Sequence, residues 1–236
     1  MRKFTNLLFS LILLALLAVA CQAPQEEANT EEESREAEAE TNPEAAESEE
    51  ASPAENTMVF NANLATEDDL KGLGLASEMV SQILEKRPFA TMNELDALLG
   101  AQENKAELYK NLFVPFNLNT TAEEDFKMIP GVGDRMAHEF EEYRPYASIK
   151  QFRKEIGKYV EEEEVARYEN YVFVPIDLNS ASDEDMKALP GVGDRMAHEF
   201  EEYRPYTNME QFRKEIGKYV DDKELARLER LVYIKE

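Results

Sequence analysis

Cysteine and histidine are scarce in this chain of 236 residues, which has one of the former and two of the latter. A disulfide within the chain needs a second cysteine, so Cys21 cannot form one. His138 and His198 occupy the same place in a duplicated stretch, each followed by a glutamate, which is typical of a solvated surface residue. These residues match no zinc site, and no nucleophile stands in a pattern with a base. We therefore expect neither a metal nor a cofactor, and no enzyme activity.

Positive charge is scarce as well, since 26 lysines and arginines face 50 aspartates and glutamates and the net charge is −24. Proteins dedicated to nucleic acids are usually basic on at least one face, because their cations neutralise phosphates. The composition therefore argues against nucleic-acid binding by the whole surface. A local cationic patch is still compatible with this net charge.

The stretch from residue 22 to about 57 is strongly acidic, with thirteen glutamates, a single arginine and no aromatic residue. Such a segment repels itself and has nothing to bury, which predicts a disordered, extended linker over residues 21–57. It either keeps the folded part away from a membrane as a solvated spacer or attracts a basic partner.

The first twenty residues are typical of a signal peptide. Two basic residues precede an almost unbroken apolar run, 7–20, which is too short for a membrane span. Cys21 directly follows small residues, as in a bacterial lipobox, although Leu17 lies one position further upstream than the leucine of that motif. We predict that residues 1–20 are removed and that Cys21 is lipidated, which anchors the chain in the cell envelope outside the cytoplasm, periplasmic or at the outer membrane or cell surface. Ordinary cleavage and an uncleaved anchor are the alternatives.

The rest of the chain contains an internal repeat with a period of about sixty residues. Residues 131–146 recur letter for letter as 191–206, and 151–160 recur as 211–220. A third, degenerate copy precedes them. It is recognised by Phe60-Asn61-Ala62-Asn63, which corresponds to Phe116-Asn117-Leu118-Asn119. A unit of this size buries only a modest core, so neighbouring units are expected to pack on one another. The predicted units are 58–115, 116–175 and 176–236.

Hydrophobic residues within each unit recur three and four positions apart, which predicts helices. A capping box is expected at the first helix of each unit, formed by Thr66 with Asp69, Thr121 with Glu124, and Ser182 with Asp185. Four short helices in two turn-linked pairs make one unit, and we predict an all-α fold. In the second unit the core-facing residues of the four helices are Phe126 and Ile129, then Met136, Ala137, Phe140 and Tyr143, then Ile149, Phe152 and Ile156, and finally Val165, Tyr168 and Val172.

The most informative stretch is Pro130-Gly131-Val132-Gly133-Asp134-Arg135-Met136-Ala137, which is repeated in full as 190–197. Two glycines one residue apart, after a proline and before an amphipathic run, predict a tight turn that opens a helix. We expect the glycines to adopt positive φ and to let a ligand approach the backbone closely. The unpaired N–H groups of the new helix would then face a phosphate oxygen.

Three motifs together resemble the tandem helix-hairpin-helix domain family of the competence DNA receptor ComEA. They are Leu118-Asn119-x-x-x-x-Glu124-Asp125, the Pro-Gly-Val-Gly-x-Arg-x-Ala stretch and a closing Tyr143-Arg144. The resemblance covers residues from about 58 to 236. It implies that hairpin amides hold the phosphates of double-stranded DNA without reading its bases, and that a basic residue after the second glycine assists. The positions it implies are Gly131, Val132, Gly133 and Arg135 in the second unit, and Gly191, Val192, Gly193 and Arg195 in the third.

The chain departs from that family in two places. The first unit reads Gly74-Leu75-Ala76-Ser77-Glu78, without the proline, the second glycine or the basic residue, so we expect it to be a structural copy. The second hairpin of each later unit is reduced to Ile-Gly-Lys-Tyr, where Lys158 and Lys218 are the candidate DNA contacts. Arg135 and Lys158 could gather into a patch with Lys150, Arg153 and Lys154, and Arg195 and Lys218 with Arg213 and Lys214. Alternatively, most of these cations pair with glutamates such as Glu139, Glu141, Glu142 and Glu155.

Two hypotheses about function follow. The first is an exported lipoprotein that binds DNA without sequence preference, similar to the receptors of competence and DNA uptake. The second is an acidic scaffold or protein-interaction lipoprotein that has kept the fold, has lost DNA binding and binds another envelope protein.

Overall fold

The computed structural model of the protein describes residues 58–101 and 104–235. The predicted signal peptide, residues 1–20, the lipidation of Cys21 and the acidic linker, residues 21–57, lie outside the described residues.

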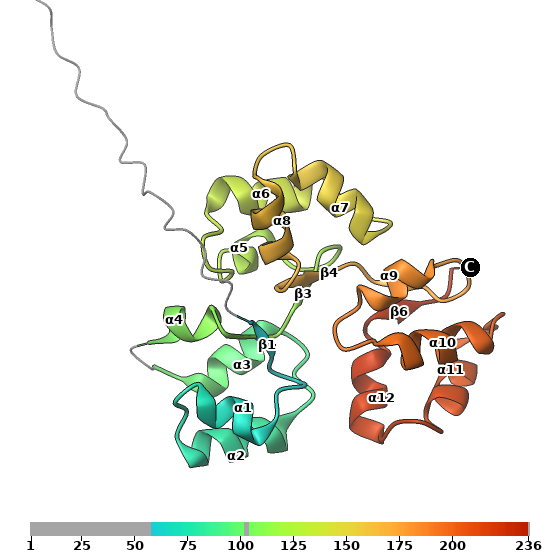
Figure 1. The fold of residues 1–236 in the computed structure, drawn as a ribbon, viewed down its shortest axis with the longest axis horizontal. Coiled ribbons are helices and arrows are strands. Elements are labelled where there is room, and N and C mark those ends of the chain that lie inside the picture. The colour runs from blue at the N-terminus through green and yellow to red at the C-terminus, as the bar shows by residue number, and fades with distance from the viewer. Residues whose placement is uncertain (1–57, 102–103, 236) are drawn as a thin grey trace, which may run out of the picture. The chain divides into compact units, whose positions relative to one another are not determined.

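The described chain is mainly helical, and the same order of elements, strand, four helices and strand, occurs three times along it (Figure 1). The first segment comprises β1 (Phe60–Asn61), α1 (Glu67–Gly72), α2 (Ser77–Lys86), α3 (Met92–Leu99), α4 (Lys105–Tyr109) and β2 (Leu112–Phe113). The second comprises β3 (Phe116–Asn117), α5 (Glu123–Phe126), α6 (Asp134–Glu142), α7 (Ile149–Ile156), α8 (Glu162–Tyr168) and β4 (Val172–Phe173). The third comprises β5 (Ile176–Asp177), α9 (Asp183–Lys187), α10 (Asp194–Glu202), α11 (Met209–Ile216), α12 (Asp222–Leu228) and β6 (Val232–Tyr233).

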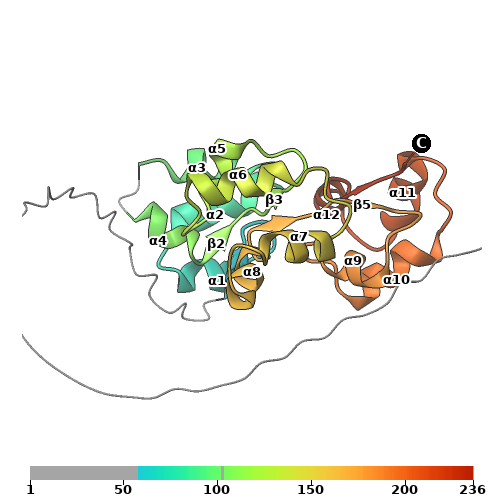
Figure 2. The ribbon, with the colours of Figure 1, turned by 90° about the horizontal axis from the view of Figure 1, so that it is seen from above.

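The strands correct the prediction of a purely helical fold. The two strands of each segment pair in parallel, and the registers join Phe60 to Leu112, Phe116 to Val172, and Ile176 to Val232. Each pair therefore brings together the start and the end of its segment. Val172, predicted on the face of a fourth helix, is buried but lies in β4. Figure 2 shows the same ribbon from above.

The capping boxes are confirmed in part. Thr66 and Asp69 cap each other reciprocally at the start of α1, and the Ser182 hydroxyl accepts a hydrogen bond from the Asp185 amide at 3.2 Å. The box predicted at Thr121 is wrong, because α5 begins one residue later and its N-cap is Ala122, whose methyl group accepts no hydrogen bond. Three carboxylates in its first turn favour α5 through the helix dipole instead.

In each segment an asparagine side chain links two backbone stretches that are distant in the sequence. In the second segment the Asn119 amide nitrogen donates to the Tyr146 carbonyl at 2.9 Å, and its oxygen accepts from the Tyr146 amide at 2.7 Å. Asn63 bonds Phe89 in the same two-way manner, and Asn179 bonds Tyr206. These bonds tie the residues after the first strand to the chain that enters the third helix.

The core of the second segment is aromatic. Phe126, Phe140 and Phe152 are fully buried, with ring centroids 5.3 and 5.4 Å apart along the series and edge-to-face geometry. The predicted core face is confirmed for Ile129, Ala137, Ile149, Ile156, Val165 and Tyr168 as well, while Met136 and Tyr143 are half-buried. The first two segments share one hydrophobic core, and the third has its own.

The longest helix among residues 58–101 and 104–235 is α2, with ten residues. A helix needs about twenty apolar residues to cross a membrane. Within this part of the chain, then, no helix has the length and hydrophobicity of a membrane span.

Candidate functional site

A tight turn at a glycine with positive φ precedes the second helix of each segment; it is called the glycine corner here and lies at Gly74, Gly131 and Gly191. Gly131 has a φ of 79° and Gly191 a φ of 73°, so the predicted positive φ is confirmed for the first glycine of each hairpin. Both glycines are exposed, and the valine that follows each is buried and anchors the turn. The prediction is wrong for Gly133 and Gly193, because these have φ values of −94° and −90° and extended backbone at the helix N-cap.

The corner leaves backbone donors at the start of α6 and α10. The Val132 amide is used within the turn, since it donates to the Ile129 carbonyl at 3.0 Å. The first amide of α6 with a backbone acceptor is that of Ala137, which donates to the Gly133 carbonyl. N-cap Gly133 supplies no side-chain acceptor. In the part of the chain that the structure describes, the amides of Gly133, Asp134, Arg135 and Met136 therefore have no acceptor, and the third segment repeats this arrangement.

The protein places its own carboxylate beside these donors. Asp134 is the first residue of α6, is highly exposed and lies 2.5 Å from the Lys127 ammonium. Asp194 holds the same position in α10 and lies 2.8 Å from Lys187. The hydrogen bond with Asp134 is the main cause that raises the pKa of Lys127 to about 12, and that with Lys187 lowers the pKa of Asp194. A carboxylate here suits the helix dipole but competes with an external anion.

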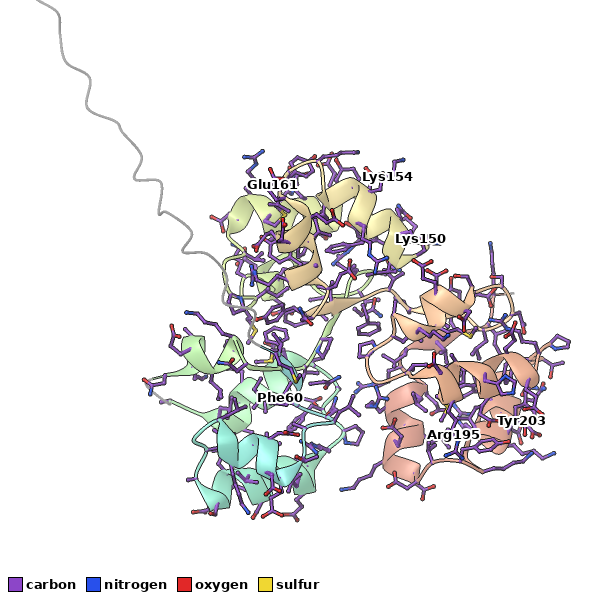
Figure 3. The ribbon with its side chains drawn as sticks, in the orientation of Figure 1. Phe60, Lys150, Lys154, Glu161, Arg195 and Tyr203 are labelled. Carbon is purple, nitrogen blue, oxygen red and sulfur yellow. The ribbon has the colours of Figure 1, made fainter. Side chains whose placement is uncertain are left out.

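Arg135 and Arg195 are exposed and lie one residue after these aspartates. Among the described residues, no carboxylate lies within 4.0 Å of either guanidinium group. The Arg135 guanidinium lies 5.8 Å from the centre of the Tyr159 ring, within the range of a cation–π contact. Arg195 is labelled near the start of α10 in Figure 3. Each hairpin thus combines backbone donors with one cation that has no carboxylate partner in the described part of the chain.

Lys158 belongs to the reduced second hairpin and is brought close to Arg135 by a pair of tyrosines. The hydroxyl groups of Tyr143 and Tyr159 are 2.6 Å apart, and the Lys158 ammonium lies 4.8 Å from the Tyr143 ring centre. Lys158 also forms an ion pair with Glu155, the main cause that raises its pKa. The third segment repeats this cluster with Lys218, Tyr203, Tyr219 and Glu215.

The remaining cations of the expected patch lie elsewhere. Lys150, Arg153 and Lys154 line a groove between α7 and α8 (Figure 3). Lys150 pairs with Glu184 at 2.8 Å and Arg153 with Glu169 at 2.6 Å. In the third segment Arg213 pairs with Glu229, and Lys214 lies 3.8 Å from Glu215. The expected cationic set therefore divides in two, and its larger part is engaged with carboxylates.

Arg167 and Arg227, which lie behind the two glycine corners, were not predicted as functional residues. A Cβ atom on Gly131 would lie 3.1 Å from Nη2 of Arg167, and one on Gly191 would lie 3.0 Å from Nη2 of Arg227. Their only signal in the sequence is that the same arginine recurs at the sixty-residue period while the first unit has Glu107 there. A Cβ atom on Gly191 would also clash with the Leu64 side chain, so the third corner has less free space than the second.

The first segment keeps the corner without its functional groups. Gly74 has a φ of 78°, but Ala76 is the N-cap and Glu78 stands where the other segments have arginine. An anion approaching this helix would meet a carboxylate instead of a guanidinium group. The described residues contain no group of three or more histidines, cysteines or carboxylates placed to hold a metal ion.

Residues 172–232, from β4 at the end of the second segment to the first residue of β6 in the third, match the protein family described as the helix-hairpin-helix motif. That motif indicates nucleic-acid binding in general. No curated protein matches the chain, and no solved structure does.

Proposed function

We propose that this protein binds double-stranded DNA without sequence preference, as a non-enzymatic protein of the cell envelope. The observation that carries the proposal is the exposed corner at Gly131 and Gly191. Among the described residues, each corner is followed by amides without acceptors and by an arginine without a carboxylate partner. Backbone N–H groups at a helix start suit phosphate oxygens. Contacts of this kind position DNA but read no base, so no sequence preference is expected.

Each hairpin is a weak phosphate-binding site in this proposal. The amides at the start of α6 donate to one phosphate, and the Arg135 guanidinium neutralises the same or the adjacent phosphate. Gly191 and Arg195 do the same in the third segment. Because both hairpins belong to one chain, binding of one raises the effective concentration of the other for the same duplex. Two weak sites can in this way give a useful affinity despite a net charge of −24.

The alternative function is that of an acidic scaffold that binds another envelope protein. The observation that favours it is the pair Asp134 and Asp194, which put a negative charge at the first residue of the two helices whose amides would hold a phosphate. A protein that has lost DNA binding would retain the hairpins only as turns. The two functions make opposite predictions for DNA affinity.

Export and lipidation complete the proposal and are supported by the sequence alone. The apolar run before Cys21 would direct the chain out of the cytoplasm, and lipidation would anchor it, as in a lipoprotein that resembles competence receptors. Replacement of Cys21 by alanine should abolish incorporation of labelled fatty acid and release the chain from the membrane fraction. Labelling that persists in this variant would contradict the anchor.

The test of DNA binding is a matched pair of charge reversals in the full chain. Arg135→Glu with Arg195→Glu should abolish duplex binding, because both hairpin cations are lost. Lys154→Glu with Lys214→Glu changes the net charge equally at two repeated positions whose side chains are 77% exposed. This control should retain most of the affinity. Equal losses in both variants, or none in either, would contradict binding at the hairpins, and unchanged helicity would show that the variants fold.

A further inference from the structure

We infer that Arg167 and Arg227 are positioning residues that hold the two glycine corners in shape for phosphate binding. The inference rests on the proposed function. It concerns side chains that contact the corner from the protein interior and that reach no ligand themselves.

Hydrogen bonds inside the protein hold the Arg227 guanidinium group in place. Its Nε and Nη2 atoms donate to the two carboxylate oxygens of Glu224, both at 2.7 Å, and its Nη1 atom donates to the Pro190 carbonyl at 2.5 Å. Only 6% of the side chain is exposed. With its three donor nitrogens bonded inside the protein, this guanidinium group cannot reach a phosphate. It acts on the chain just before Gly191.

Arg167 repeats the pairing with glutamate in the second segment, without a counterpart of the bond to the Pro190 carbonyl among the described residues. Its Nε and Nη2 atoms donate to Glu164 at 2.7 and 2.6 Å, and the guanidinium group lies 4.8 Å from the centre of the Tyr168 ring. The side chain is 22% exposed. Its Nη2 atom occupies the space next to Gly131 that any larger residue would need. Glycine at the corner therefore meets two demands, the positive φ and the nearby guanidinium group.

The burial calls for an explanation beyond the ion pair. An arginine and a glutamate three residues apart on a helix can pair at the surface, without the desolvation that burial of a charge costs. The first segment shows what happens without such a residue. It has Glu107 at the corresponding position, nothing within 4 Å of a Cβ atom on Gly74, and no cation after the corner. The guanidinium group thus occurs only with the two hairpins that have Arg135 or Arg195.

The test is duplex binding of the full-length Arg167→Lys, Arg227→Lys double variant, measured over a range of salt concentrations. Lysine keeps the positive charge but cannot form the bidentate hydrogen bond that arginine donates to the glutamate carboxylate. We expect the affinity to fall about tenfold with an unchanged salt dependence, because the number of phosphates contacted sets that slope. A reduced slope would identify direct phosphate contacts and overturn the inference, as would an unchanged affinity. Arg153→Lys with Arg213→Lys is the matched control, since these arginines pair with Glu169 and Glu229 away from the corners.

A second readout separates this inference from the proposed function. The amide NMR signals of Gly131 and Gly191 should shift in the double variant while that of Gly74, which has no such arginine, stays in place. If the wild-type chain binds no DNA but these shifts occur, the proposed function fails and the corner contact stands. If the shifts do not occur, the inference fails whatever the chain binds. Should the double variant not fold, Glu164→Gln with Glu224→Gln weakens the same contact with both arginines in place, and the same signals decide.

Discussion

The Lys127 ammonium lies 2.5 Å from the Asp134 carboxylate, at the point where α6 begins with amides that have no acceptor within residues 58–101 and 104–235. Lys187 and Asp194 repeat the pair at α10. The protein thus places a negative charge of its own beside each group of amides, and one cation next to each hairpin is already paired. This arrangement reconciles intact hairpins with an acidic chain, because a phosphate that binds must compete with a carboxylate already present.

Replacement of Asp134 and Asp194 by asparagine should therefore strengthen DNA binding. The change removes two negative charges beside the amides, while Lys127 and Lys187 keep their ion pairs with Glu124 and Asp183. We therefore expect the affinity at low salt to rise about tenfold. Duplex binding followed by fluorescence anisotropy measures it.

The matched control is Glu162→Gln with Asp222→Asn, which removes the same two charges from the first residues of α8 and α12. If this control gained as much affinity as the hairpin variant, the effect would come from net charge and the local competition would be refuted.

Replacement of Gly131 by alanine should destabilise the fold, whereas replacement of Gly133 should not. Gly131 has positive φ and faces Arg167, so an alanine there is expected to lower the free energy of unfolding by about 1–2 kcal/mol. Gly133 has ordinary extended backbone and nothing within 4 Å of a Cβ atom, so its variant should stay within about 0.5 kcal/mol of wild type. Urea denaturation compares them. Equal losses at the two positions would show that both glycines are required by the backbone.

Much of the fold could be predicted from the sequence, because helix faces are local patterns. The spacing of Phe126, Phe140 and Phe152 correctly placed them in the core, and the first glycine of each hairpin has the expected φ. The strand pairs were not predicted, because a strand of two residues is too short to show an alternation of apolar and polar side chains. Each pair also joins the start and the end of a segment, over fifty residues apart in the sequence. Arg167 was missed for a related reason. Its contact with Gly131 crosses the segment, and no local pattern encodes it.

His138 should carry a pH-dependent contribution to stability. Its Nδ1 atom lies 3.3 Å from Glu123, and that hydrogen bond is the main cause that raises the histidine pKa above its ordinary value of 6.5. The folded state therefore binds the proton more tightly than the unfolded chain. The contribution is fully present below the unfolded pKa and is lost as the pH rises through the folded one. An NMR titration should show the raised pKa, and Glu123→Gln should return it toward 6.5. A wild-type pKa that equals that of the variant would contradict the pairing.

The central claim, that two hairpin corners bind DNA phosphates in an acidic protein, is tested most directly by duplex affinity measured against salt concentration. We expect binding of the full chain at about 50 mM salt, and the logarithm of the affinity should fall linearly with the logarithm of the salt concentration, by about 0.9 per phosphate neutralised. The slope should also be the same for duplexes of unrelated sequence. No binding at that salt concentration, or an affinity that salt does not change, would contradict the claim and favour the scaffold.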